Sequence, residues 1–135
     1  MSAGLVAHCA ELLALLGSVR TRRMFGGHGF WVDGLFIALI TSERLHLKTN
    51  DDTVAKFAAA GSAQFVYMSQ GKPQHLNYWT APDEAMDSPE AMHPWARLAM
   101  QAAVAARMAK PDAARAANKR RTRGKAQAQV QAKTN

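Results

Sequence analysis

The feature that most constrains the fold is the dipeptide Asp33-Gly34, which stands between two apolar runs at residues 30–32 and 35–41. Such a dipeptide favours a two-residue hairpin turn, because both residues accept the positive φ angles that match the right-handed twist of the flanking strands. The second run is apolar at nearly every position, which is typical of a central strand. The sequence therefore predicts an antiparallel hairpin at the heart of a sheet.

Further strands are expected on both sides of this turn. Upstream, three glycines at positions 26, 27 and 29 indicate one strand with a bulge, or a place where a helix packs close to the sheet. Downstream, Leu45 and Leu47 alternate with polar residues, which predicts one buried face and one solvent face. The expected strands cover residues 24–32, 35–41, 44–48, 65–68 and 76–80.

Three helices complete the predicted order. Apolar residues at steps of three and four predict a helix over residues 4–16, and a second helix over residues 54–60 ends at Gly61. Ser88 and Pro89 have the residue types of a helix cap and first turn, and Pro94 is expected to separate that turn from the main helix. The order α-β-β-β-α-β-β-α predicts a two-layer α+β fold, with an antiparallel sheet of about five strands and helices on one face.

The net charge of +7 is confined to the C-terminal end of the chain. Up to Ala109 nine basic residues face nine acidic ones, whereas eight basic residues after that point face only Asp112. We therefore expect a neutral folded domain over residues 1–110 and a basic tail over residues 111–135. The tail is rich in Ala, Lys, Arg and Gln, so we expect it to be mostly disordered, with partial helix between residues 112 and 121.

Two observations favour a cytoplasmic protein. The longest apolar run, near residues 35–40, is shorter than the roughly 20 residues that a membrane-spanning helix needs. Cys9 is the single cysteine, so no internal disulfide is available, as is usual in a reducing compartment. Because Cys9 lies on the apolar stripe of the first helix, we expect it to act as a small buried hydrophobe.

Basic residues are the candidate binding residues. Arg22 and Arg23 beside the glycines, and Lys72 in a turn, are candidate contacts for an anion or a partner protein. In the tail, Lys and Arg are the residue types that contact phosphates, which gives a set of candidate nucleic-acid contacts. This set is Lys119, Arg120, Arg121, Arg123 and Lys125.

No other residues form a pattern with clear chemistry. The five histidines lack zinc-ligand spacing, so we expect scattered surface or edge positions for them and no metal site. Four strand aromatics resemble a stacking platform for bases, but core packing explains them as well, and we favour packing. They are Trp31, Tyr67, Tyr78 and Trp79. We assign no catalytic residue and no cofactor.

The ordered blocks of this sequence resemble the N-terminal domain of the TfoX/Sxy family over about residues 8–107. The blocks are RRMFGG at 22–27, GFWVDGLF at 29–36, LHLK at 45–48, FVYM at 65–68, GKP at 71–73, YW at 78–79 and PWA at 94–96. The resemblance implies the α+β fold predicted above. It also implies a regulator of natural competence that acts with the cyclic-AMP receptor protein and has no known enzymatic activity. The basic tail stands where the founding members carry a second domain.

Two functions remain open at this point. The first is a non-enzymatic regulatory module in transcription, which binds a protein partner while the basic tail makes non-specific contact with DNA. The alternative is a protein-binding adaptor or homodimer, unrelated to DNA, that works through a sheet edge or an apolar patch. An enzyme is not expected, since no nucleophile with a positioned base and no phosphate-binding loop is present.

Overall fold

The computed structural model describes residues 3–24 and 26–123. Its elements are, in chain order, α1 (Ala3–Leu13), β1 (Val19–Met24), β2 (Gly27–Val32), β3 (Leu35–Thr41), β4 (Arg44–Lys48), α2 (Val54–Ala59), β5 (Gln64–Ser69), β6 (Lys72–Thr80), a 3₁₀ turn (Asp83–Asp87) and α3 (Pro89–Arg123). The chain divides into a first unit that ends at Ala103 and a second that begins at Val104.

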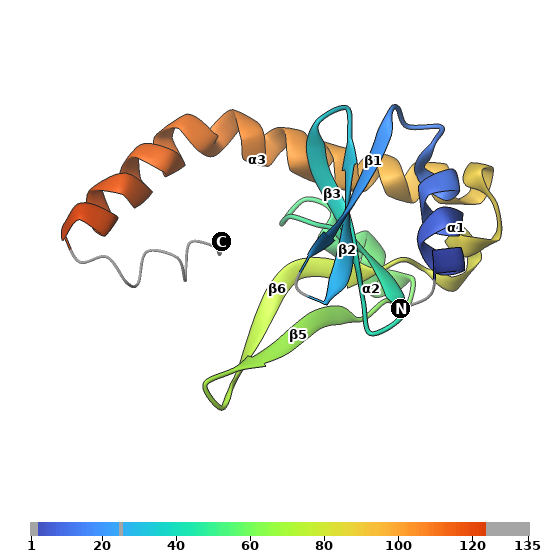
Figure 1. The fold of residues 1–135 in the computed structure, drawn as a ribbon, viewed down its shortest axis with the longest axis horizontal. Coiled ribbons are helices and arrows are strands. Elements are labelled where there is room, and N and C mark those ends of the chain that lie inside the picture. The colour runs from blue at the N-terminus through green and yellow to red at the C-terminus, as the bar shows by residue number, and fades with distance from the viewer. Residues whose placement is uncertain (1–2, 25, 124–135) are drawn as a thin grey trace. The chain divides into compact units, whose positions relative to one another are not determined.

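The strands form one antiparallel sheet in the order β1-β2-β3-β4-β6-β5. Figure 1 shows β5 and β6 as a long hairpin that extends below the other labelled strands. The predicted α+β class, the antiparallel sheet and the succession of elements are confirmed, but the described residues contain six strands. The stretch expected as one strand over residues 24–32 contains the end of β1 and all of β2, with Gly26 at a φ of +77° between them. The sequence did not predict β1 because four of its six residues are exposed and three are arginines.

Three hairpin turns hold neighbouring strands in register. The predicted turn at Asp33-Gly34 is confirmed, with φ angles of 49° and 84°, and Gln70-Gly71 joins β5 to β6 in the same way, at 53° and 77°. The turn between β3 and β4 uses Ser42-Glu43, at 55° and 60°. That conformation costs a non-glycine residue about 1–2 kcal/mol, so the strand pairing on either side must compensate.

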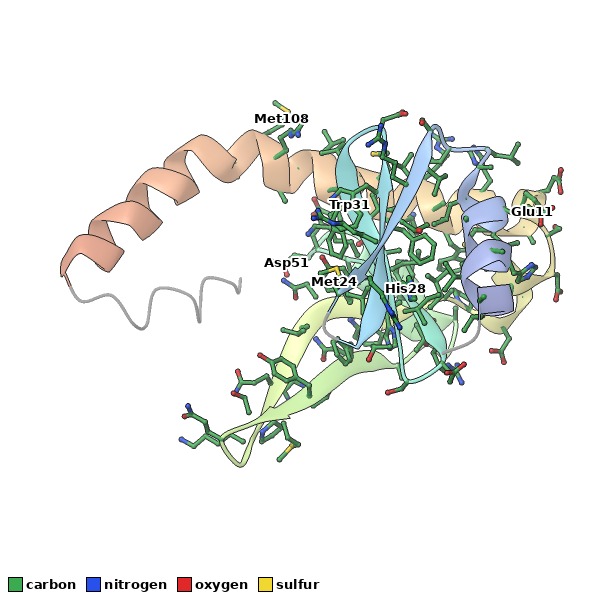
Figure 2. All side chains as sticks on the ribbon, in the orientation of Figure 1. Glu11, Met24, His28, Trp31, Asp51 and Met108 are labelled. Atoms are coloured by element: carbon green, nitrogen blue, oxygen red, sulfur yellow. The ribbon has the colours of Figure 1, made fainter. Side chains whose placement is uncertain are left out.

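α1, α2 and the part of α3 that belongs to the first unit pack against one face of the sheet, as predicted. Strands β2, β3 and β4 contribute apolar side chains that pack against the buried sides of the helices. Figure 2 shows side chains filling the space between the sheet and α1. The strand members are Phe30, Val32, Ile37, Ala38, Ile40, Leu45 and Leu47. The helix members include Cys9, Leu12 and Leu13 of α1, Phe57 of α2, and Met92, Ala96 and Ala99 of α3.

The start of α3 follows the predicted chemistry with one difference. The Ala91 N–H donates to Ser88 Oγ at 3.0 Å, and Pro89 is the first helical residue, so the expected cap is confirmed. Pro94 does not break the helix, which runs on without interruption. Proline removes one backbone hydrogen bond, and the burial of Met92 and Ala96 on either side of Pro94 compensates for that loss. Within the described residues no helix combines the length and apolar composition needed to cross a bilayer.

Candidate binding surface

The face of the sheet opposite the helical core carries a row of cations and aromatic rings. Residues paired in an antiparallel ladder share a face. Arg20 on β1 pairs with Trp31 on β2, and Trp31 pairs with Phe36 on β3. Lys48 on β4 pairs with Tyr78 on β6. Trp31 alternates with the core residues on either side of it, and Lys48 with Leu47, so the row lies on the other face. We call Arg20, Trp31, Phe36, Lys48 and Tyr78 the cross-strand row.

Direct contacts make the row continuous. The ring centroids of Trp31 and Phe36 are 4.8 Å apart, and those of Phe36 and Tyr78 are 5.9 Å apart. Lys48 Nζ donates to the Tyr78 hydroxyl at 3.3 Å and lies 5.2 Å from the centroid of that ring. All three rings are half-buried, so each packs on a neighbour and still reaches the surface. The rings are therefore held in place before any ligand arrives.

Gly29 makes room for this row. A Cβ at Gly29 would lie 2.6 Å from Met24 Sδ, 2.6 Å from a ring carbon of Phe36 and 3.1 Å from a ring carbon of Trp31. The side chains thus lie over the β2 backbone where a larger residue would stand. A bulge does occur after Phe30, as the glycines suggested, but the atoms nearest a Cβ at Gly29 belong to strand side chains of the open face and not to a helix.

The charges of this face are not neutralised by acids. Within the described residues, no carboxylate forms an ion pair with Arg20, Arg22 or Lys48. Burial lowers the pKa of Lys48, because removing water disfavours its charged form, and burial raises the pKa of Tyr78 for the corresponding reason. A half-buried ammonium group whose polar partner is a phenol gains free energy from an anion.

A groove of about 580 Å³ lies beside the row at the edge strand β1. Its lining comprises Ser18, Arg20, Thr21, Arg22, Trp31, Asp33 and Gly34. Asp33 is the acidic member, and its carboxylate accepts the Ser18 N–H at 2.9 Å, so a backbone donor already engages it. The groove thus presents two exposed arginines next to one edge of an indole ring.

The structure separates the three basic residues expected to contact an anion or a partner. Arg22 shares the open face with Arg20, whereas Arg23 points to the other face because neighbours on a strand alternate. Lys72 lies at the tip of the β5–β6 hairpin, opposite Ser69, and β6 is four strand spacings, about 19 Å, from β1. Sequence reasoning missed Arg20 and Lys48. The two-residue spacing from Arg22 to Arg20 would have indicated the first, had β1 been recognised.

The tail candidates fall at the end of the described chain. Four of them lie within the helical backbone of α3, which reaches Arg123 and so includes the part expected to be helical. These four are Lys119, Arg120, Arg121 and Arg123. Lys125 lies outside the described residues, as does most of the segment expected to be disordered.

Two predictions about β4 are wrong. His46 was expected at the surface but is only 6% exposed, and Lys48 on the same side is half-buried. His46 is buried because the ring of Phe65 lies over it, with the two ring centroids 5.1 Å apart. The Arg44 carbonyl lies 3.1 Å from His46 Nδ1, and burial lowers the pKa of this histidine. Neighbouring rings therefore cover the polar side of β4 at His46 and Lys48, while Arg44 stays exposed.

The preference for core packing of the four strand aromatics holds for one of them. Trp79 packs against the core, while Trp31 and Tyr78 belong to the cross-strand row and Tyr67 is 46% exposed. Cys9 is a small hydrophobe as predicted: it is fully buried, and burial raises the pKa of its thiol to about 11. The described part of the chain has no group of three or more His, Cys, Asp or Glu that could hold a metal ion.

Comparison with known proteins identifies the first unit. A family model described as the TfoX N-terminal domain matches residues 11–103, which end where the first unit ends. Among curated proteins none matches the chain significantly. The match includes the whole sheet, α2, and the start of α3, and with them every residue of the cross-strand row.

Proposed function

This chain belongs to the TfoX N-terminal domain family, and from that membership we propose that it is a non-enzymatic regulatory module acting in transcription, in the cytoplasm. Its TfoX/Sxy-like character as a regulatory module follows from the family itself. The proposal adds two contacts. The folded domain binds a protein partner, for which the family suggests the cyclic-AMP receptor protein, and the basic tail contacts DNA.

The observation that carries the proposal is the division of charge along the chain. The neutral portion of the sequence has nine basic and nine acidic residues up to Ala109, and it contains the matched domain. Eight basic residues and one acidic residue follow. A neutral domain gains little from non-specific attraction to DNA, whereas clustered Lys and Arg release counterions from phosphates. The division of charge therefore supports a proposal in which the domain binds protein and the tail contacts duplex DNA.

Neutralising the tail is expected to abolish most binding to duplex DNA. In the full-length chain, Lys119, Arg120, Arg121, Arg123 and Lys125 are replaced together by Gln, and a short labelled duplex is titrated by fluorescence anisotropy between about 50 and 200 mM salt. About six phosphate contacts give the parent chain a log–log slope near −5, and the variant should lose most of that slope. A chain truncated after Lys110 should behave like the variant.

The control is Lys56→Gln, which removes one exposed charge from α2 within the neutral part. It should leave both affinity and salt slope unchanged. If the tail variant binds duplex DNA with the affinity and slope of the parent, the role of the tail is wrong.

The edge strand β5 supports the protein-binding part of the proposal. Its segment Gln64–Ser69 carries no charge, and Val66, Tyr67 and Met68 are 41%, 46% and 64% exposed. At the other edge of the same sheet, β1 carries three arginines. Charged side chains protect an edge strand from pairing with another chain, so β1 is protected and β5 is open to a partner.

Placing a charge on this edge is expected to weaken partner capture. Full-length Met68→Lys should retain cyclic-AMP receptor protein about tenfold less well than the parent, because a buried lysine at a packed contact costs binding free energy. Ala59→Lys adds the same charge at an exposed position of α2 and should have no effect. Equal capture by all three chains would contradict docking at β5.

The same edge also favours the second candidate function, a homodimer or adaptor unrelated to DNA. Sedimentation of these chains separates the two. A parent dimer that becomes a monomer in Met68→Lys, together with unchanged DNA binding in the tail variant, would replace the transcription proposal by the adaptor.

A further inference from the structure

We propose that the open face of the sheet, along the cross-strand row and the arginine groove, is a binding site for single-stranded nucleic acid. The site is distinct from both the tail and the β5 edge. Its phosphate contacts are Arg20, Arg22 and Lys48, and its stacking surfaces are the rings of Trp31 and Tyr78, with Phe36 between them.

The order of side chains across the sheet is the first argument. From β1 to β6 the row presents Arg20, then the rings of Trp31 and Phe36, then Lys48 with Tyr78. This row crosses four strand spacings, about 19 Å. A single strand offers phosphates and unstacked bases in alternation, and proteins that bind such strands combine a cationic path with aromatic rings on a sheet.

The unsatisfied charge is the second argument. Lys48 is half-buried against Tyr78, and no described carboxylate pairs with it or with Arg20 or Arg22. Half-burying an ammonium group without an acid is costly, whereas a structural role in the sheet would be served by an apolar residue. A phosphate supplies the missing negative charge. The acid in the groove, Asp33, already accepts a backbone N–H and is held by it.

The third argument separates a single strand from other anionic macromolecules. The bases of a duplex stack on one another, so their faces are not available to stack on the rings of the row. An acidic peptide would match the cations but would give the exposed parts of the Trp31, Phe36 and Tyr78 rings no stacking partner. The groove of about 580 Å³ beside Trp31 has room for a single nucleotide unit at the edge of the row.

The experiment uses the full-length chain with the five tail residues changed to Gln, so that the tail keeps only Arg115 and Lys133 against Asp112 and its contribution is small. A labelled oligothymidine of about ten nucleotides is titrated by fluorescence anisotropy over a salt series. Adding Arg20→Gln and Arg22→Gln should weaken binding by about tenfold or more. The same pair should reduce the log–log salt slope by about 1.4, since each single-strand phosphate contact contributes about 0.7.

Arg23→Gln is the matched control. It removes one positive charge, half of what the pair removes, from an exposed position of the same strand that faces the other way, and should change the affinity by no more than about twofold. Trp31→Leu tests stacking and should weaken binding by about 5- to 140-fold, the range that base–aromatic stacking gives. Its folding is checked by circular dichroism and thermal melting, and the arginine variants keep the proposal testable if Trp31→Leu unfolds.

Three results would overturn the proposal. One is no binding of the oligothymidine by the chain that carries the five tail substitutions. Another is a loss of binding free energy in Arg23→Gln that is half of the loss in the Arg20/Arg22 pair, because an equal loss per charge would indicate diffuse attraction to net charge. The third is displacement of the oligothymidine by polyglutamate combined with full binding by folded Trp31→Leu, which would assign the cations to an acidic peptide. A failure of duplex binding through the tail would leave this proposal untouched.

Discussion

Truncating Phe57 to alanine is expected to lower the free energy of unfolding by about 3–5 kcal/mol. Phe57 is fully buried, and its ring meets that of Trp95 in an edge-on contact with centroids 5.1 Å apart. It is the buried residue of α2, a helix of six residues that is too short to persist without tertiary contacts. One ring therefore joins α2 to α3 and to the sheet.

Because small domains have only about 5–15 kcal/mol of stability, this single change should remove a large part of it. Urea unfolding followed by tryptophan fluorescence measures the loss. Lys56→Ala, at an exposed neighbouring position on α2, should stay within about 0.5 kcal/mol of the parent. A Phe57→Ala chain as stable as Lys56→Ala would mean that α2 is not part of the core.

Replacing Gly27 by alanine is expected to destabilise the domain by about 3 kcal/mol or more, at or above the upper end for an overpacked core site. A Cβ at this buried position would collide with the backbone carbonyl oxygen of Ile40 on the neighbouring strand β3. Side chains can turn away from a clash, but a backbone carbonyl in a sheet can move only if the strands separate. The change should therefore weaken pairing at the centre of the sheet.

Two neighbouring glycines provide matched controls. At Gly26 a Cβ would meet nothing within 4 Å, and alanine there should cost only the about 1–2 kcal/mol of a positive φ. At Gly29 the nearest atoms belong to side chains, among them the flexible end of Met24, so part of the clash can relax. Thermal melting should place Gly27→Ala lowest, by roughly 4–8 °C per kcal/mol in a domain of this size. A Gly27→Ala chain that melts no lower than Gly26→Ala would contradict this account.

The proposed contacts use separate parts of the molecule. The tail carries the net charge, β5 offers an uncharged edge, and the cross-strand row lies on the open face and runs from β1 to β6. Each has its own variants and its own control, so the loss of one contact does not depend on the others.

Local signals predicted the local features. Asp33-Gly34 predicted its hairpin because only a few residues accept two successive positive φ angles. Ser88 and Pro89 predicted the start of α3 because the cap needs a side-chain oxygen at one fixed place. The sequence did not predict β1, because its exposed arginines follow no alternation of buried and exposed residues. Pro94 was expected to interrupt the helix, but the packing of α3 compensates for the one hydrogen bond that proline removes.

The sequence by itself determined the α+β class, the antiparallel hairpins, the buried Cys9 and the confinement of net charge to the C-terminal end, since each depends on residues near one another in the chain. Tertiary structure alone decided that Arg20, Trp31, Phe36, Lys48 and Tyr78 form one row, and that Arg22 and Arg23 face apart. These five residues come from five strands and meet through strand order and register. A shift of one residue in any strand would turn its side chains to the other face, and register is set by pairing partners distant in sequence.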